Sequence, residues 1–297
     1  MRPAPLPVRD GLGAARVRLH GGAVLAELTT RFGEQARAKV LAGEVVDAAG
    51  AVIDEATVLP TGASVYLYRD LPDEVPVPFD IPVLHRDDDI VVVDKPHFLA
   101  TMPRGSHVAQ TALVRLRKEL GLPELSPAHR LDRLTAGVLV FTTRREVRGA
   151  YQMLFARGEV RKTYLAGAAV DPALVFPRLV RSRIIKRRSH LQAVCEPGEP
   201  NAETLVELLS PDGLYRLTPR TGRTHQLRVQ MASLGLPIIG DPLYPKVIDV
   251  PAGDFSTPLR LLAQRIEFDD PFTGSRRMFL SRRTIEVGSG GGHDDAG

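Results

Sequence analysis

Over residues 83–286 the hydrophobic pattern changes between strand and helix periods without a long break. Apolar runs at residues 89–94 and 138–141 are rich in β-branched side chains and have the length of buried strands. Residues 145–156 and 225–233 instead have the spacing of helices. The pattern therefore predicts one large domain in which strands and helices are mixed.

A smaller unit is predicted at residues 21–70. Residues 24–39 carry apolar side chains at roughly helical spacing, with Gly33 as a point where the helix could break, and short strands follow. The preceding residues 1–20 are rich in Pro and Gly and lack a sustained period, so we expect an arm on the surface.

Two further stretches are predicted to lie outside both units. Residues 71–82 contain four prolines and are expected to form a semi-rigid linker between the small and the large unit. Residues 287–297 are Gly-rich and cannot bury apolar surface, so we expect a disordered tail.

The composition narrows the possible chemistry. Hydrophobic residues make up 43% of the 297-residue chain, and no apolar run approaches the roughly 18 residues of a transmembrane helix. The N-terminus also lacks the apolar core of a signal peptide. A single cysteine excludes an internal disulfide and fits a reducing cytoplasm, where we expect the protein. The eight histidines have no paired-ligand spacing, so we expect no metal site.

Basic residues change this picture. The net charge is +4 and the pI is about 9.4, and most of the 39 basic residues are Arg, whose planar guanidinium suits phosphate recognition. A GC-rich genome also encodes Arg without functional cause, so clustering matters more than the total. The densest cluster is at residues 178–190. It is either a solvated face or, if it borders a cleft, a track for phosphates.

Residues 129–141, H-R-L-D-R-L-T-A-G-V-L-V-F, place one carboxylate at the entrance of a predicted buried strand. Asp132 lies between Arg130 and Arg133, and small residues lead from it into the apolar run. A loop anchored by a buried strand can hold a reactive side chain rigidly at a cleft. The same residues could also form a structural ion pair at a strand entrance.

A second dense stretch follows at residues 218–244. Its R-T-G-R segment at 220–223 predicts a turn that presents guanidinium and backbone N–H groups, just before the helix at 225–233. One Asp and several Arg, without a metal site or an activated Ser or Cys, leave a nucleophile or general base as the role of Asp132. From the residues alone, we interpret the chain as a nucleic-acid-processing enzyme with one catalytic Asp.

The motifs H-R-L-D-R-L-T-A-G at 129–137, K-T-Y at 162–164 and R-T-G-R-T-H-Q-L-R at 220–228 give a more specific interpretation. Together they resemble the RluA family of RNA pseudouridine synthases. The likeness implies an α+β catalytic domain over residues 83–286, with a central, mostly antiparallel sheet and flanking helices. The active cleft is expected to cross the middle of this sheet. Residues 21–70 resemble the small RNA-binding domain that precedes it in many of these enzymes.

The resemblance implies an enzyme that isomerises a uridine of structured RNA to pseudouridine, without metal or cofactor. The uracil is detached from C1′, turned and rejoined through C5. Asp132 is then the catalytic carboxylate, which either attacks C1′ or removes the C2′ proton. Tyr164 matches the aromatic residue that packs on the flipped uracil, Arg223 the arginine that pairs with the carboxylate, and Arg130 the arginine that fills the gap left by the base.

Supporting roles follow for other motif residues. His129 and Arg133 flank the catalytic loop, and His129 is expected to buttress it rather than act as an acid. Thr221, His225 and Gln226 are expected to secure the turn between loop and helix.

Two departures lie near the C-terminal end. Leu262 stands where the family often has His, so only an apolar contact from Leu261 or Leu262 is transferred. Asp270 likewise stands where the family has His before a proline. Neither departure affects Asp132, Tyr164 or Arg223.

Two other classes of protein stay open. A non-catalytic RNA-binding protein could keep the fold, although it would need no carboxylate among phosphates. A glycosidase would need a second carboxylate within about 5–10 Å, and neither dense stretch offers one. We expect large-subunit ribosomal RNA as the first target and transfer RNA as the second, because the family includes both. A monomer is the simplest expectation.

Overall fold

The computed structural model describes residues 5–188 and 190–286, so the predicted tail at 287–297 lies outside the described residues. The chain divides into two compact units. The smaller contains Met1–Glu74 and Val114–Pro123, and the larger contains Val75–Leu113 and the rest of the chain from Glu124. Residues 68–82, which include the predicted linker, contain no helix or strand.

The small unit combines two helices with two short sheets around its own apolar core. Leu28 and Val40 of the helices pack with Val65 of the sheet in this core. Its elements are β1 (Ala15–Arg18), β2 (Gly22–Ala23), α1 (Val24–Phe32), α2 (Glu34–Leu41), β3 (Val46–Asp47), β4 (Val58–Leu59) and β5 (Ser64–Leu67), with sheet orders β1-β5-β3 and β2-β4.

The predicted break at Gly33 is confirmed, but the predicted arm is wrong at one point. Gly33 adopts a positive φ of 79° between α1 and α2, a conformation that glycine tolerates best. Within residues 1–20, β1 pairs antiparallel with β5 and Val17 packs against the core. The four-residue strand alternates apolar residues with two arginines, so it was too short to show a period.

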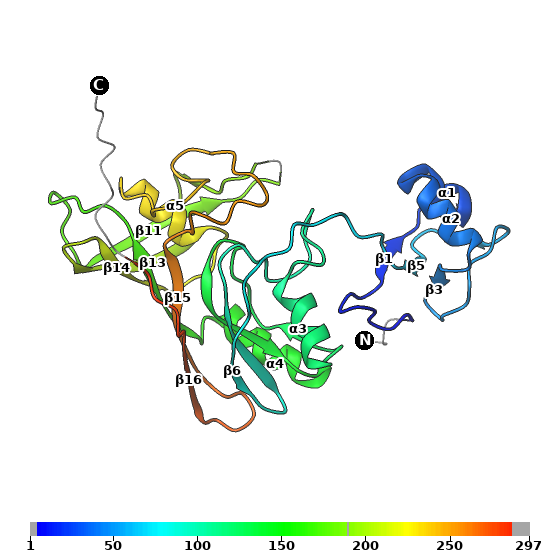
Figure 1. The fold of residues 1–297 in the computed structure, drawn as a ribbon, viewed down its shortest axis with the longest axis horizontal. Coiled ribbons are helices and arrows are strands. Elements are labelled where there is room, and N and C mark those ends of the chain that lie inside the picture. The colour runs from blue at the N-terminus through cyan, green and yellow to red at the C-terminus, as the bar shows by residue number, and fades with distance from the viewer. Residues whose placement is uncertain (1–4, 189, 287–297) are drawn as a thin grey trace. The chain divides into compact units, whose positions relative to one another are not determined.

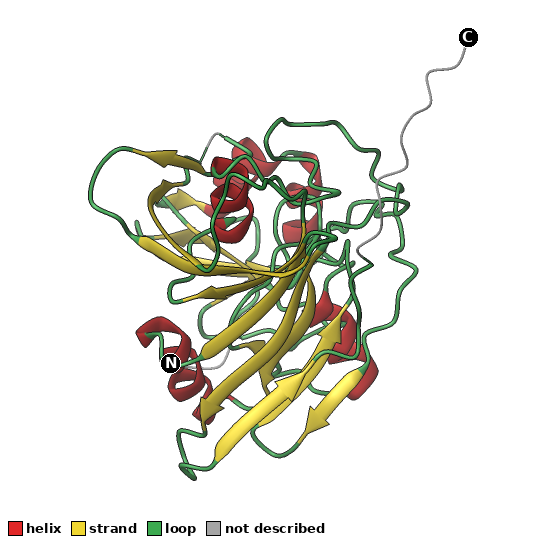
Figure 2. Cartoon of the chain, turned by 90° about the vertical axis from the view of Figure 1, so that its left-hand side faces the viewer, coloured by secondary structure: helices red, strands yellow, loops and turns green. Residues whose placement is uncertain are grey.

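The large unit is built on an 11-stranded sheet (Figures 1 and 2). Its main path runs β12-β11-β13-β14-β10-β15-β9-β7-β6, while β16 pairs with β15 and β8 with β9. The strands are β6 (Val83–Arg86), β7 (Ile90–Lys95), β8 (Ser126–Pro127), β9 (Ala136–Thr142), β10 (Arg161–Gly167), β11 (Arg178–Ile185), β12 (Val194–Glu196), β13 (Ala202–Ser210), β14 (Leu214–Pro219), β15 (Leu261–Asp269) and β16 (Arg276–Leu280).

The predicted mixture of helices with a mostly antiparallel sheet is confirmed. Helix α4 (Arg145–Arg157) shares a core cluster with β7, β9 and β15, whereas α5 (Gln226–Ser233) shares another with β10, β13 and β14. A further helix, α3 (Ala112–Leu120), falls across the boundary between the two units. Within residues 83–188 and 190–286 the strand pairs are antiparallel except β9 with β15.

The parallel pair explains the glycine of the first motif. Gly137 pairs with Ala263 at the start of β9 and has φ 113°. A Cβ atom here would lie 2.2 Å from the carbonyl oxygen of Ala263, a distance that no real side chain reaches. Gly137 therefore lets β9 and β15 approach each other, and this contact fixes the end of the loop that carries Asp132.

Candidate active site

A cleft in the large unit brings the two dense motifs together. The Asp132 loop forms part of its wall, and the turn before α5 forms another part. Side chains of β10, α4 and β15 also line it. The predicted site residues that line the cleft are His129, Arg130, Asp132, Tyr164, Thr221, Arg223, His225, Gln226 and Leu261. Arg228, which was not among the predicted site residues, lines the cleft as well.

Asp132 meets two groups from the other motif. Its Oδ2 lies 3.5 Å from Nη1 of Arg228 and 4.0 Å from Nε2 of His225. The Asp132 side chain keeps 28% of its surface exposed, so a ligand in the cleft can reach the carboxylate. The site thus joins an accessible carboxylate with a fixed positive charge.

Arg228 is held in place by a second carboxylate. Its Nε and Nη2 donate to the two oxygens of Asp241 at 2.7 and 2.6 Å, a fork that fixes the guanidinium plane. Asp241 also accepts hydrogen bonds from the N–H groups of Leu243 and Tyr244. Burial lowers the pKa of Arg228, but the contacts with Asp241 and then the charge of Asp132 outweigh this effect and raise the pKa overall. The guanidinium therefore stays charged.

The prediction that Arg223 pairs with Asp132 is wrong, because Arg228 contacts this carboxylate instead. Among the described residues Asp132 forms no ion pair with Arg223, whose Nε donates to the carbonyl of Asn201 at 3.0 Å. Arg228 takes that place from the first turn of α5, three residues after the N-cap residue His225. Arg228 belongs to the motif at residues 220–228, but the motif alone does not decide which of its arginines meets Asp132.

A buried lysine and a threonine support the Asp132 loop from behind. Lys95 Nζ donates to the carbonyls of Pro96, Leu99 and Arg133 at 2.9, 2.7 and 3.3 Å. The hydroxyl of Thr101 donates to the carbonyl of Leu131 and accepts its N–H. Burial lowers the pKa of Lys95 to about 7, partly offset by the charge of Asp132.

The geometry around His129 agrees with a buttress. Its ring stacks on Phe155 of α4 with centroids 4.3 Å apart, and its Nε2 accepts the N–H of Val140 at 3.2 Å. Burial, and then the charge of Lys162, lower the pKa of His129 to about 3. The imidazole is therefore neutral near pH 7, as its acceptor role requires.

Hydrogen bonds also fix the turn before α5. Gln226 accepts from the hydroxyl of Thr221 and the N–H of Arg223, and donates to the carbonyl of Glu203. His225 adopts φ 57°, uncommon outside glycine, and its Nδ1 lies 3.0 Å from the hydroxyl of Tyr244. Gln226 therefore ties the turn to β13, while His225 also reaches the carboxylate.

Of the remaining predicted residues, Tyr164 and Arg130 lie at the cleft, whereas Arg133 does not. Tyr164 of β10 is half-buried, and burial followed by the charge of Asp132 raises the pKa of its phenol. Arg130 is exposed at the cleft. Arg133 instead lines a separate, largely apolar pocket with Leu134 and Ile238, so the structure does not bring it to the cleft.

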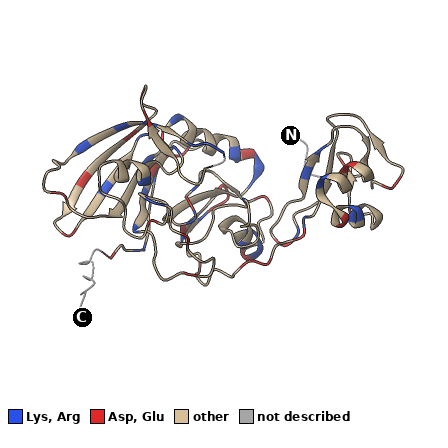
Figure 3. Ribbon diagram, turned by 90° about the horizontal axis from the view of Figure 1, so that it is seen from above, with Lys and Arg blue, Asp and Glu red and all other residues tan. Residues whose placement is uncertain are grey.

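Burial lowers the pKa of His225 in the cleft, and Lys186, one residue of the Arg-rich run, is close enough for its charge to lower it further. None of the run's described basic residues lines the cleft, and Arg181 and Arg187 pair with Glu203 and Glu196. Figure 3 shows Lys and Arg on several strands and loops of the large unit, interspersed with Asp and Glu. This run therefore gives no separate evidence of a phosphate track.

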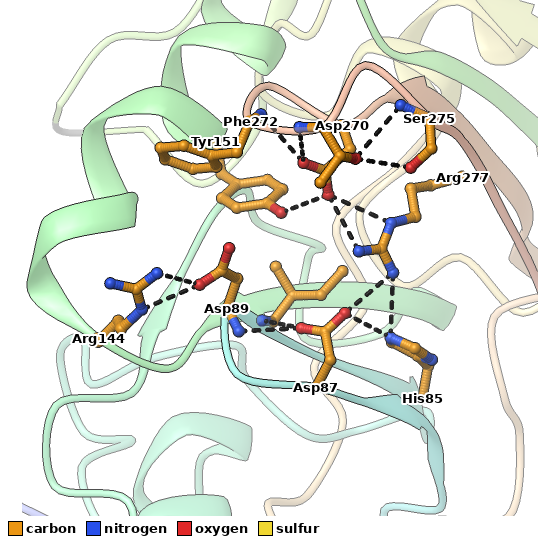
Figure 4. A network of polar contacts seen from close by, with 11 residues as sticks. His85, Asp87, Asp89, Arg144, Tyr151, Asp270, Phe272, Ser275 and Arg277 are labelled. Carbon is orange, nitrogen blue, oxygen red and sulfur yellow. Dashed lines mark hydrogen bonds and ion pairs between the residues drawn. The ribbon is translucent and has the colours of Figure 1, made fainter.

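A second polar cluster has the character of a structural network (Figure 4). Arg277 pairs with Asp87 at 2.9 Å and with Asp270 at 3.1 Å, and the hydroxyl of Tyr151 donates to Asp270 at 2.8 Å. His85 lies 2.8 Å from the same Asp87 oxygen. These contacts tie α4 and the turn before β7 to β16. Arg277 thus gives Asp270 a partner in this chain.

Within residues 5–188 and 190–286, no group of His, Cys, Asp and Glu has the arrangement of a metal site. In the same part of the chain, none of the helices has the length and apolar character needed to cross a membrane. The expectation that neither dense stretch offers a second carboxylate is wrong, because Asp241 of the second stretch shares Arg228 with Asp132. The Asp241 side chain is fully buried and bound by Arg228, so it is unsuited to act as the second acid of a glycosidase.

Comparison with known proteins gives the same family. A family model described as RNA pseudouridylate synthase matches residues 89–233. The dual-specificity RNA pseudouridine synthase RluA of Pasteurella multocida is 34% identical over 205 residues, covering 64% of this chain and 88% of that protein. The human pseudouridylate synthase RPUSD2 is 36% identical over 172 residues, covering 56% of this chain and 31% of that protein.

A solved structure supports the fold. Human RNA Pseudouridylate Synthase Domain Containing 1 has a TM-score of 0.55 and 23% identity, covering 69% of this chain and 84% of that chain. The match to RPUSD2 extends over less than a third of that protein, whereas the bacterial RluA protein is matched over most of its length. The chain belongs to the RluA-type family of RNA pseudouridine synthases, as shown by the match to the bacterial RluA protein, by the three motifs of this chain and by their meeting at one cleft.

Proposed function

We propose that this chain isomerises a uridine of structured RNA to pseudouridine, with Asp132 as the reacting carboxylate. The observation that carries the proposal is the contact between the accessible Asp132 and the immobilised Arg228, 3.5 Å apart in a cleft. A preorganised positive charge beside a reacting group costs no reorganisation during the reaction. A protein that only binds RNA gains nothing from a carboxylate in this position.

The reaction conserves every atom of the nucleoside. The bond between C1′ and N1 breaks, a bond between C1′ and C5 forms, C5 loses a proton and N1 gains one. Asp132 acts at the ribose, either on C1′ as a nucleophile or on the C2′ proton as a base. Both routes need the uridine to leave the RNA stack and enter the cleft.

Three residues are assigned to the extruded nucleotide. Tyr164 offers a protonated, half-buried ring beside Asp132 on which uracil can stack, and Leu261 adds an apolar contact. Arg130 is exposed at the rim of the cleft and is suited to occupy the space that the base leaves in the RNA. Extrusion costs a few kcal/mol, so such filling supports the reaction.

Ribosomal RNA of the large subunit is our first candidate target and transfer RNA is the second. Among the similar proteins, the yeast mitochondrial tRNA pseudouridine(32) synthase is 35% identical over 174 residues, 37% of its length, and bacterial relatives are named dual-specificity enzymes. The small unit tilts the choice toward ribosomal RNA, since we assign residues 21–70 to RNA binding. We place the reaction in the cytoplasm.

Release of tritium from C5 tests the proposal. Ribosomal and transfer RNA transcripts labelled at C5 of uracil would be incubated separately with the wild-type protein. We expect release from one of them, because C5 exchanges its proton for the bond to C1′. Tight binding to both RNAs without release would contradict the proposed reaction on these substrates and favour the RNA-binding alternative.

A further inference from the structure

Lys162 is a cleft cation that forms no ion pair with any residue that the structure describes. It lies in β10, two residues before Tyr164, and its side chain lines the cleft. Its Nζ donates to the carbonyl of Thr221 at 3.3 Å. Among the described parts of the chain, no ion pair includes Lys162.

Three other shielded cations of this protein have compensating contacts. Arg228 binds Asp241, Arg277 binds Asp87 and Asp270, and Lys95 donates to three carbonyls. Lys162 has one long hydrogen bond, and burial lowers the pKa of its amine. Shielding a charge from water without an anion is unfavourable, so the free protein lacks a partner that a ligand could supply.

The surroundings of Lys162 favour an anion. Asp132 is the one carboxylate among the described residues that line the cleft, and its Oδ2 lies 3.5 Å from Arg228 and 4.0 Å from His225. His129, close to Lys162, is neutral near pH 7. The turn that contains Gly222 passes close to the amine, because a Cβ atom built on Gly222 would lie 3.8 Å from Nζ, an ordinary contact distance.

We propose that Lys162 binds a phosphate of the RNA strand adjacent to the target uridine. This inference rests on the proposed function, because the ribose on which Asp132 acts is joined to a phosphate on each side. Placing that ribose at Asp132 therefore carries a phosphate into the same cleft. A lysine ammonium offers three donors and a compact charge, which suits a phosphate oxygen that approaches from one side.

Salt dependence measures this contact directly. RNA affinity would be determined at several salt concentrations for the wild type, Lys162→Met and the control Arg161→Met. Arg161 is the preceding residue, is exposed and does not line the cleft, so its variant loses the same charge outside the site. Each phosphate contact contributes about 0.7–0.9 to the slope of log affinity against log salt.

We expect Lys162→Met to reduce this slope by about one contact and to raise KM about tenfold, with kcat within about twofold. Lys162→Arg should restore both, and Arg161→Met should change neither. A KM and slope unchanged in Lys162→Met would overturn the subsite, as would a loss confined to kcat. Absence of turnover by the wild type would instead contradict the proposed function, and the subsite with it.

Discussion

Asp132 depends on an arginine whose own position is fixed. The Arg228 side chain is 2% exposed and bridges Asp132 and Asp241. Removing one partner of a buried ion pair leaves an uncompensated charge, which is far more costly than losing the pair itself. The carboxylate that we propose as catalytic and the stability of this region are therefore linked through one residue.

We predict that Arg228→Met lowers kcat at least about a hundredfold and the free energy of unfolding by about 3–5 kcal/mol. Arg228→Lys, which keeps the charge but cannot hold both Asp241 oxygens and reach Asp132, should lose activity with a smaller loss of stability. Tritium release and denaturant unfolding would measure both effects. Arg223→Met is the matched control, and an equal loss of kcat in that variant would contradict the assignment.

At the residue scale the sequence indicated the carboxylate that lines the cleft but not the arginine that contacts it. Asp132 follows from its motif because an acid between two arginines before a buried strand is a local pattern. The choice between Arg223 and Arg228 depends on the phase of α5 and on Asp241, which lies 13 residues further along the chain. That phase is decided by packing against β10, β13 and β14, so the motif alone leaves it open.

At the scale of elements, the approach of β9 to β15 sets the end of the catalytic loop. Gly137→Ala is predicted to lower the free energy of unfolding by more than about 2 kcal/mol, because a Cβ at positive φ would collide with the Ala263 carbonyl. Chemical denaturation would measure the loss. Gly149→Ala in α4, where no atom lies within 4 Å, should stabilise the protein by about 0.5–1 kcal/mol. Similar effects in both variants would contradict the steric account.

The network of Figure 4 gives a second prediction for the elements. Burial raises the pKa of Asp87, but hydrogen bonds from His85, two backbone N–H groups and Arg277 outweigh it and lower the pKa to about 2. Its contribution, about 2 kcal/mol, is therefore complete above the unfolded pKa and is lost as the pH falls through about 2.

Unfolding of the wild type and Asp87→Asn would be compared from pH 6 to pH 2. We expect the difference between them to shrink toward pH 2, and a constant difference would contradict the network. Asp88→Asn, at the exposed neighbouring residue, should change the free energy of unfolding by less than about 0.5 kcal/mol.

Helices and strands were predicted correctly where the hydrophobic pattern extends over many residues, and they were missed where it is short. Helices α4 and α5 and strand β7 match the predicted ranges to within about two residues. Strand β1 was missed because its pairing with β5, almost 50 residues away, replaces a local signal. Long-range pairing decides such strands, and no local window contains it.

At the scale of the whole molecule, the large sheet brings together motifs that are about 90 residues apart in the sequence. β9 and β10 both pair with β15, which places the Asp132 loop and Tyr164 on adjoining parts of one sheet, and α5 supplies Arg228. The meeting of these motifs could be expected only from the family resemblance. The sequence does not predict the hydrogen bond from Lys95 to the carbonyl of Arg133. It also does not predict that the Arg133 side chain lies outside the cleft. Both findings come from the structure.

The most direct measurement compares tritium release from C5-labelled substrate RNA by the wild type and Asp132→Ala, with RNA affinity measured for both. We predict release by the wild type and none by the variant, because the carboxylate that acts on the ribose is gone. RNA affinity should stay within a few-fold, since Asp132 is not a phosphate-binding group. Release that persists in Asp132→Ala would contradict the central role of this carboxylate.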